Sequence, residues 1–416
     1  MMNIPYFRPS IGQDEKDAVN EVLSSGWLTS GQAVKKFESN FASLLQVPHA
    51  VAVNSCTAAL HLAFEAAGIG RDDVVLVPAM TFAATAATVR YLGARPVLVD
   101  SDPVTLNMDP KAAEQAAREW SCRGSLKAIT AVHYGGQIAD VDRLGELAGR
   151  YGIPLIEDAA HALPALSRRG PDQPWRNVGS TGLLTCFSFY ANKCITTGEG
   201  GMVVTADPGL AERVRMMSLH GLSKSAWNRF TTKAAWYYEI LEPGFKYNLT
   251  DVAAAIGTAQ LAKAQKFWES RQRVAELYNY RLAECEEFLE RPTELPDRRS
   301  SWHLYPIRLR LDQLKIDRAE FIVKLAEMGV GTSVHWMPLH LHPYYSQTYG
   351  YRAEDFPVAS SVWPRLVSLP IFPAMGEAEV DYICDSIESI CRQYRAHKPA
   401  QAVAMAAAMG DRKSVV

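Results

Sequence analysis

One lysine, Lys193, stands between an apolar strand-like run and a glycine-rich turn. The segment 188–193 reads Ser-Phe-Tyr-Ala-Asn-Lys, and the segment 196–201 reads Thr-Thr-Gly-Glu-Gly-Gly. An amine withdrawn from water at such a place has a lowered pKa and is nucleophilic, which Schiff-base formation with a carbonyl requires. A solvent-exposed lysine at a strand end is the alternative, and this segment alone does not decide between them.

A carboxylate ends another strand-like run, in the segment 156–161, which reads Ile-Glu-Asp-Ala-Ala-His. Asp158 would be partly buried there and would need a cationic partner or several hydrogen bonds. A protonated pyridine nitrogen is one such partner, and a carboxylate that keeps it protonated strengthens the ring as an electron acceptor. Taken alone, the segment is more typical of an aspartate that caps a helix.

Small polar residues open a helical pattern in the segment 54–60, which reads Asn-Ser-Cys-Thr-Ala-Ala-Leu. The free N–H groups and the positive dipole end of a helix start favour a phosphate, and the hydroxyls of Ser55 and Thr57 add donors. Alone, this pattern is more often a simple helix cap. Phe82 follows a further apolar run and could stack on a flat ring. Together with the lysine and the aspartate, these are the parts of a site for pyridoxal 5′-phosphate (PLP).

Seven short β-branched runs between residues 45 and 210 alternate with helical patterns. Their spacing of about 20 to 30 residues is that of a strand plus a crossover helix, which predicts a largely parallel sheet covered by helices. Such a sheet binds ligands at the carboxyl ends of its strands, where several of the polar residues above lie. The runs are 49–53, 74–77, 96–100, 128–133, 154–158, 184–189 and 202–205.

The flanking regions predict further helices and a second, smaller α+β domain. Residues 15–45 read as helices interrupted at Gly26 and Gly31, and residues 251–289 read as one long amphipathic stretch. The remainder has strand-like runs at 303–309 and 331–335 and helical patterns at 318–328 and 377–394. We expect an N-terminal segment and large domain over 1–250, a connecting helix and small domain over 251–395, and a flexible tail over 396–416.

Composition and charge exclude several classes of protein. With 43 Lys+Arg against 45 Asp+Glu the net charge is −2, so the charge gives no reason to expect a dedicated nucleic-acid binder. The seven cysteines have no paired spacing, which argues against a disulfide framework and a structural zinc site. We see no secretory signal and no apolar run long enough for a membrane-spanning helix, so we expect a cytoplasmic protein without a membrane partner.

From Pro5 to about Tyr394 the sequence closely resembles the DegT/DnrJ/EryC1/StrS family of PLP-dependent nucleotide-sugar aminotransferases. The resemblance implies the fold-type I aminotransferase architecture, an α/β fold with a mostly parallel seven-stranded sheet and a smaller C-terminal α+β domain. Besides the segments above, it depends on 26–31 (Gly-Trp-Leu-Thr-Ser-Gly), 133–136 (His-Tyr-Gly-Gly), 220–221 (His-Gly), 244–251 (Gly-Phe-Lys-Tyr-Asn-Leu-Thr-Asp) and 331–335 (Gly-Thr-Ser-Val-His).

The resemblance also implies a role for individual residues. Lys193 would be the catalytic Schiff-base lysine, and Asp158 the partner of the pyridine nitrogen. Ser55, Cys56, Thr57 and Ser188 would contact the phosphate, Phe82 would stack on the ring, and His161 would lie near the ring face or the 3′-oxygen. Asn248 would reach the phosphate of the neighbouring subunit, which implies a homodimer with shared active sites.

By the same resemblance, the reaction moves an amino group from L-glutamate to a nucleotide-diphosphate-linked keto-sugar and releases 2-oxoglutarate. The amino sugar would serve polysaccharide, glycan or antibiotic biosynthesis. Trp27, Lys224, Arg229 and His335 lie in family-like segments that could line the cleft for the sugar substrate, although each could equally be an ordinary surface or packing residue.

Two residues depart from the family pattern, in which many members carry glycine at the position of Cys56 and glutamine at that of His161. We expect the phosphate seat to survive if it uses backbone N–H groups, since the Cys56 side chain can point away. For His161 we favour a position beside the cofactor without an essential role. His133, His220 and His303 read as structural hydrogen-bonding histidines, and His340 with His342 lacks a third ligand for a metal.

Three other functions compete with the aminotransferase. Dehydratases of the group replace the Schiff-base lysine with histidine, which Lys193 disfavours. A catalytically silent PLP-binding regulator or sensor would keep the cofactor seat without needing a competent lysine. A plain nucleotide-binding protein is unsupported, because the sequence contains neither a dinucleotide-binding nor a P-loop glycine motif.

Overall fold

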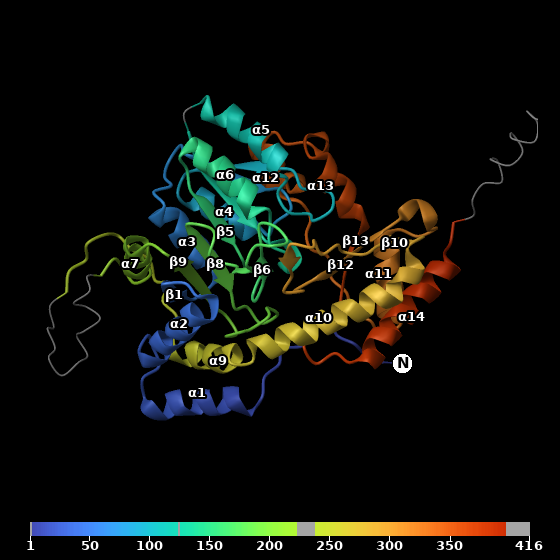
Figure 1. Ribbon diagram of the computed structural model, residues 1–416, viewed down its shortest axis with the longest axis horizontal. Helices are drawn as coiled ribbons and strands as arrows, with labels where there is room; N and C mark the ends of the chain where they lie inside the picture. The colour runs from blue at the N-terminus through green and yellow to red at the C-terminus, as the bar shows by residue number, and fades with distance from the viewer. Residues whose placement is uncertain (1, 124, 223–237, 397–416) are drawn as a thin grey trace, which may run out of the picture.

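A seven-stranded sheet forms the centre of the larger part of the molecule in the computed structural model, which describes residues 2–123, 125–222 and 238–396 (Figure 1). In spatial order the strands are β1 (His49–Val53), β9 (Gly201–Thr205), β8 (Leu184–Ser188), β5 (Leu155–Asp158), β4 (Leu126–Val132), β2 (Val74–Pro78) and β3 (Arg95–Val99). Strands β8, β5, β4, β2 and β3 run parallel, and β9 is antiparallel to both neighbours. The predicted mostly parallel sheet is therefore confirmed, and all seven predicted runs are its strands.

Helices cover both faces of this sheet, because successive residues of a buried strand point to opposite sides. In β3, Val97 and Val99 join one apolar core while Leu98 joins the other. The first core takes in α2 (Gln32–Leu45), α5 (Pro110–Ser121), α6 (Val141–Tyr151) and α9 (Asp251–Leu261). The second takes in α3 (Cys56–Ala66), α4 (Ala83–Tyr91), α7 (Pro208–Met217), α12 (Pro343–Tyr349) and α13 (Pro357–Val362).

The N-terminal helices break at the two predicted glycines. Helix α1 (Gln13–Ser25) ends at Gly26, whose φ of 72° is in the left-handed region that glycine tolerates best. Helix α2 begins after Gly31 and has no side-chain cap of its own. Instead, the buried carboxylate of Asp251 accepts the N–H groups of Gly31, Ala33 and Val34, at 2.7, 3.3 and 3.0 Å. This long-range cap fixes the start of α2 against α9.

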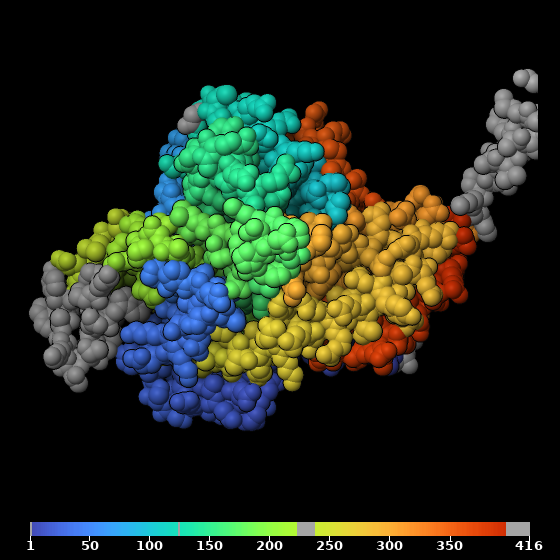
Figure 2. All heavy atoms as spheres, in the orientation of Figure 1, coloured from blue at the N-terminus to red at the C-terminus, as the bar shows by residue number. Residues whose placement is uncertain are grey.

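The prediction that residues 251–289 form one continuous amphipathic stretch is wrong. The structure has α9 and then α10 (Ala264–Arg281), separated at Ala262 and Lys263. The break allows the two helices to serve different cores, since Leu261 packs in the first core of the large sheet and Tyr278 packs in the core of the C-terminal part. Figure 2 shows the yellow residues of this region running without a break from the blue N-terminal helices to the orange and red C-terminal part.

The C-terminal part is a smaller α+β unit with its own core. Its antiparallel sheet contains β10 (Leu289–Glu290), β12 (Tyr305–Leu309) and β13 (Leu366–Leu369), flanked by α11 (Arg318–Glu327) and α14 (Glu377–Gln393). The strand predicted at 331–335 is wrong: only Ser333 bridges to Ser368, and the chain then leaves the sheet. Strand β13, which pairs with the central strand β12, was not among the predicted strands.

The N-terminal segment also packs on this C-terminal core. Ile4 is buried in it, and Gly331 N–H donates to the carbonyl of Ile4 at 2.8 Å. A division of the chain at residue 250 remains our proposal, with residues 2–4 contacting the smaller unit. Residues 397–416, most of the predicted tail, lie outside the described residues.

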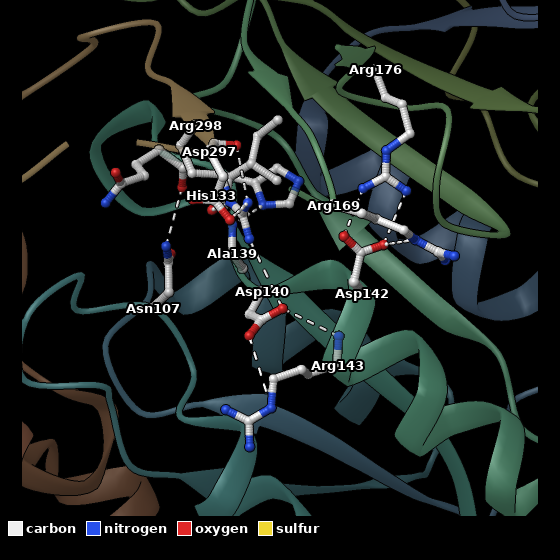
Figure 3. Close-up of polar contacts among 12 residues, drawn as sticks. Asn107, His133, Ala139, Asp140, Asp142, Arg143, Arg169, Arg176, Asp297 and Arg298 are labelled. Atoms are coloured by element: carbon white, nitrogen blue, oxygen red, sulfur yellow. Dashed lines mark hydrogen bonds and ion pairs between the residues drawn. The ribbon is translucent and has the colours of Figure 1, made fainter. Parts of the chain in front are cut away.

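A small third sheet joins the two parts of the molecule. It pairs β11 (Arg298–Arg299) with β6 (Leu166–Ser167), and β6 with β7 (Arg176–Asn177). The buried Arg298 guanidinium donates to the carbonyl of Ile138 at 3.1 Å and lies beside Asp140 and Asp297 (Figure 3). Arg298 thereby ties the C-terminal part to the loop that follows β4, close to the carboxyl ends of the large sheet.

Within the described residues, no helix is long and apolar enough to cross a membrane. The same part of the chain contains no group of three or more His, Cys, Asp or Glu side chains arranged to hold a metal ion. His340 instead shares a hydrogen bond with the Ser360 hydroxyl at 2.9 Å, and His342 with the carbonyl of Met337 at 3.2 Å.

Candidate active site

A cavity of about 380 Å³ opens at the carboxyl ends of β4, β5 and β8, against the N-terminus of α3. The fold brings nine of the predicted site residues to its wall, and the rest of the wall includes Thr81, Tyr190, Asn192, Glu199 and Trp336. The nine are Ser55, Cys56, Thr57, Phe82, Asp158, His161, Ser188, Lys193 and His335. Residues that the sequence separates by up to about 280 positions therefore share one site.

Lys193 presents its amine in this cavity from the turn after β8. Burial lowers the pKa of the amine from 10.5 to about 8, although the charge of Asp158 opposes this shift. The glycines that follow allow the turn to pack closely: a Cβ atom on Gly201 would come within 2.5 Å of the backbone of Ser55. The start of β9 thus lies directly on the first turn of α3, and the lysine is held beside that helix end.

Asp158 ends β5 and is 5% exposed. Its hydrogen-bond partners among the described residues are neutral. The Thr85 hydroxyl donates to Oδ2 at 2.7 Å, the N–H of Ala160 donates to Oδ1 at 3.1 Å, and the Cys56 thiol donates to Oδ1 at 4.0 Å. Burial is the main cause that raises the pKa of this carboxyl. A cationic ring nitrogen entering the cavity would therefore stabilise its ionised form.

The N-terminus of α3 lines the cavity. Ser55 caps the helix by accepting the N–H of Ala58 at 3.0 Å, and Thr57 lines the cavity. The Cys56 side chain faces the end of β5, with its Sγ 4.0 Å from Asp158 Oδ1, and the survival of the phosphate seat beside this cysteine stays a prediction. Burial holds the pKa of this thiol well above its usual value, so the thiol stays neutral and does not repel the carboxylate.

Aromatic rings form part of the cavity wall. The His161 ring stacks on that of Trp336 with centroids 4.9 Å apart. The His303 ring packs on the His161 ring with centroids 4.2 Å apart. Burial, reinforced by the charge of Lys193, holds the pKa of His161 well below its usual value, so the ring is neutral. Its Nδ1 is buried without a hydrogen-bond partner among the described residues. Phe82 lies at the mouth of the cavity, 59% exposed and free to cover a ring.

His335 is placed by the C-terminal part. Its Nδ1 shares a hydrogen bond with Ser368 Oγ at 2.9 Å, and Tyr6 stacks on its ring at 5.7 Å. Burial lowers the pKa of His335 to about 4, with the charge of Lys193 acting in the same direction. The adjacent Trp336 was not among the predicted site residues, although an aromatic residue directly after a predicted site histidine was a usable signal.

Two predicted site residues lie away from the cavity of their own chain. Trp27 Nε1 donates to the carbonyl of Ser30 at 3.4 Å, and Asn248 Nδ2 donates to Ser30 Oγ at 2.8 Å. Neither residue lines the cavity. Lys224 and Arg229 lie outside the described residues.

Behind Asp158, a fully buried pair supports the strand end. Ala139 N–H donates to His133 Nδ1 at 3.2 Å, so the neutral ring carries its proton on Nε2 and donates it to Glu157 Oε2 at 2.8 Å (Figure 3 shows His133 and Ala139). The structural role predicted for His133 fits these contacts. For His303 it does not, since both ring nitrogens are buried without a partner among the described residues.

Comparison with known proteins identifies the family. The model of the DegT/DnrJ/EryC1/StrS aminotransferase family matches residues 9–388. The chain belongs to this family. It is 41% identical to the spore coat polysaccharide biosynthesis protein SpsC of Bacillus subtilis, over 94% of this chain and 97% of that protein.

Solved structures agree with this assignment. Spr1654 from Streptococcus pneumoniae, in its PLP form, superimposes with a TM-score of 0.85 at 29% identity, covering 94% of this chain and 99% of that chain. Helicobacter pylori PseC, an aminotransferase involved in the biosynthesis of pseudoaminic acid, gives a TM-score of 0.84 at 27% identity, covering 94% and 100%. The protein is a PLP-dependent sugar aminotransferase with the fold-type I architecture.

The residues of the cavity fit PLP. The helix end offers N–H donors for a phosphate, and Asp158 forms no ion pair among the described residues. In the same part of the chain, His161 Nδ1 and Asn192 Oδ1 are buried polar atoms without hydrogen-bond partners. When bound, PLP supplies an aldehyde that links to amines and a ring that withdraws electrons from the neighbouring carbon.

Proposed function

We propose that this protein transfers an amino group from L-glutamate to a keto-sugar linked to a nucleotide diphosphate, as a cytoplasmic homodimer. The observation that carries the proposal is the placement of Lys193. Its amine has a pKa lowered to about 8 by burial and shares one cavity with Asp158 and the N-terminus of α3. An amine so placed can link to the cofactor and also move protons at the reacting carbon.

Each residue would have one task in this reaction. The N–H groups of the α3 start, with Ser55, Thr57 and Ser188, would hold the phosphate, and Phe82 would cover the ring. Asp158 would pair with the protonated ring nitrogen. Lys193 Nζ would accept the proton from the carbon that loses the amino group and later return a proton to the sugar carbon that gains it. His161 and Trp336 would exclude water on their part of the wall.

The lowered pKa of Lys193 predicts how the apoprotein takes up PLP as pH changes. Only the neutral amine attacks an aldehyde, so the rate constant of uptake should rise with pH, pass its midpoint near pH 8 and level off above it. An exposed lysine side chain, whose pKa is about 10.4, should show a midpoint about two pH units higher. Stopped-flow absorbance between about pH 6 and pH 11, with acetyl-lysine amide as the reference, measures this. A midpoint near that of the reference would contradict it.

The position of Asn248 supports a shared site. It lies outside the cavity of its own chain, beside Ser30, while Lys246 Nζ contacts its Oδ1. A second subunit with the same Asn248 could complete the phosphate seat, which would make the dimer necessary for full PLP affinity.

Mixed dimers test this arrangement. A dimer of Lys193→Ala subunits and a dimer of Asn248→Ala subunits should each be impaired when PLP is limiting. When the two variants are unfolded, mixed and refolded together, activity should be recovered. A mixed dimer has one site with an intact lysine and an asparagine from the other subunit. If the asparagine served its own subunit instead, both sites would be defective and mixing would recover nothing.

The substrate is tested by a screen of nucleotide keto-sugars with glutamate as the amino donor. Conversion of at least one of them, with stoichiometric release of 2-oxoglutarate, is the expected result, and mass and regiochemistry of the product would identify the carbon that is aminated. The nucleotide-linked substrate would be contradicted by one combination of results. In it, glutamate converts the bound cofactor, no nucleotide keto-sugar reacts, and a free keto-sugar does react.

A further inference from the structure

Two buried threonines connect Asp158 to helix α4. Thr85, in the first turn of α4, donates its hydroxyl proton to Asp158 Oδ2 at 2.7 Å. The hydroxyl of Thr81 lies 2.8 Å from that of Thr85. Thr81 is 1% exposed and Thr85 is fully buried, so water does not compete for these groups.

The charge on Asp158 determines the direction of this chain of hydroxyls. An ionised carboxylate only accepts hydrogen bonds, so Thr85 must donate its single hydroxyl proton to Oδ2. Thr81 must then donate to Thr85. With a protonated carboxyl both bonds could reverse, but N–H of Ala160 already donates to Oδ1 at 3.1 Å, which also favours the ionised form.

We propose that Thr85, supported by Thr81, is a positioning residue for transamination: it fixes the rotation of the Asp158 carboxylate and keeps it ionised for the ring nitrogen. This inference rests on the role proposed above for Asp158. Without the hydroxyl, Oδ2 would be a buried oxygen with no donor among the described residues, and the carboxyl would rotate or take up a proton. A protonated carboxyl cannot pair with a protonated ring nitrogen.

The test is Thr85→Val, which replaces the hydroxyl by a methyl group of similar size. Titration of the apoprotein with PLP, followed by tryptophan fluorescence, should give a dissociation constant raised about tenfold or more, since hydrogen bonds to charged groups are among the stronger ones. The pH at which the absorption spectrum of the bound cofactor changes should also shift, and kcat should fall while KM for the sugar stays. Thr85→Ser, which restores the hydroxyl, should return all three values toward the wild type.

Thr88→Val is the matched control. Thr88 is buried on the same helix, but its hydroxyl donates to the backbone carbonyl of Ala84 at 2.8 Å and does not contact Asp158. This variant should lose some thermal stability and keep the PLP affinity and the spectrum. An equal loss of PLP affinity in Thr88→Val and Thr85→Val would show a general packing effect and overturn the inference.

A double-mutant cycle with Asp158→Asn separates this inference from the proposed function. If Thr85 acts through Asp158, adding Thr85→Val to Asp158→Asn should reduce the PLP affinity and kcat little further. Full additivity of the two losses would overturn the role of Thr85 while leaving that of Asp158 intact. An Asp158→Asn variant with wild-type PLP affinity, spectrum and turnover would overturn both.

Discussion

Lys193→Ala should abolish transamination and the absorption band of the lysine-linked cofactor, while the protein stays folded. General acid–base catalysis alone contributes about 10²- to 10⁴-fold, and this residue also forms the covalent link to the cofactor, so the fall in kcat should be at the top of that range or beyond. Steady-state turnover and absorbance spectra of the PLP-loaded variant measure the effect. Removal of a buried amine with a pKa of about 8 should not lower the melting temperature of the apoprotein.

Lys127→Ala is the control for this experiment. Lys127 is exposed at the start of β4, outside the cavity, and its loss should leave turnover unchanged. Measurable turnover by Lys193→Ala, above the background of free PLP with the same substrates, would remove this lysine from the mechanism.

Asp158→Asn should lower kcat by about 10²- to 10³-fold, the usual effect of removing one preorganised electrostatic group. The amide has no charge to stabilise a protonated ring nitrogen, so the ring would withdraw electrons less strongly. Since Asp158 is buried, its replacement by a neutral group should not destabilise the apoprotein. Single-turnover reaction with glutamate isolates the half-reaction in which this defect should appear.

The neighbouring carboxylate provides the matched control. Glu157 precedes Asp158 on β5 and is fully buried, but it contacts His133, Thr181 and Thr185 away from the cavity. Glu157→Gln should reduce the free energy of unfolding in denaturant titrations more than it reduces kcat. Equal kinetic losses in the two variants would mean that strand distortion, and not the charge at residue 158, controls the rate.

Much of the fold could be predicted because it depends on local sequence patterns. β-Branched runs such as 49–53 and 74–77 form strands with the predicted bounds to within a residue, since burial on both faces requires continuous apolar residues. Gly26 marks a helix break because glycine tolerates its left-handed backbone, and Gly31 marks the next because a Cβ atom there would collide with Trp27 Nε1. Where a pattern was compatible with two structures, as at 331–335, packing decided and the prediction failed.

The sequence by itself determined which chemistry is available: an amine, a carboxylate and a helix start, each at or shortly after the end of a strand. Only the tertiary structure decided what surrounds them, as with Thr85 at Asp158, His303 and Trp336 at His161, and Ser368 at His335. The reason is physical: strand and helix propensities act between residues a few positions apart. The burial that lowers the pKa of Lys193, and the Thr85 hydroxyl that donates to Asp158, come from segments that meet only when the two cores are packed.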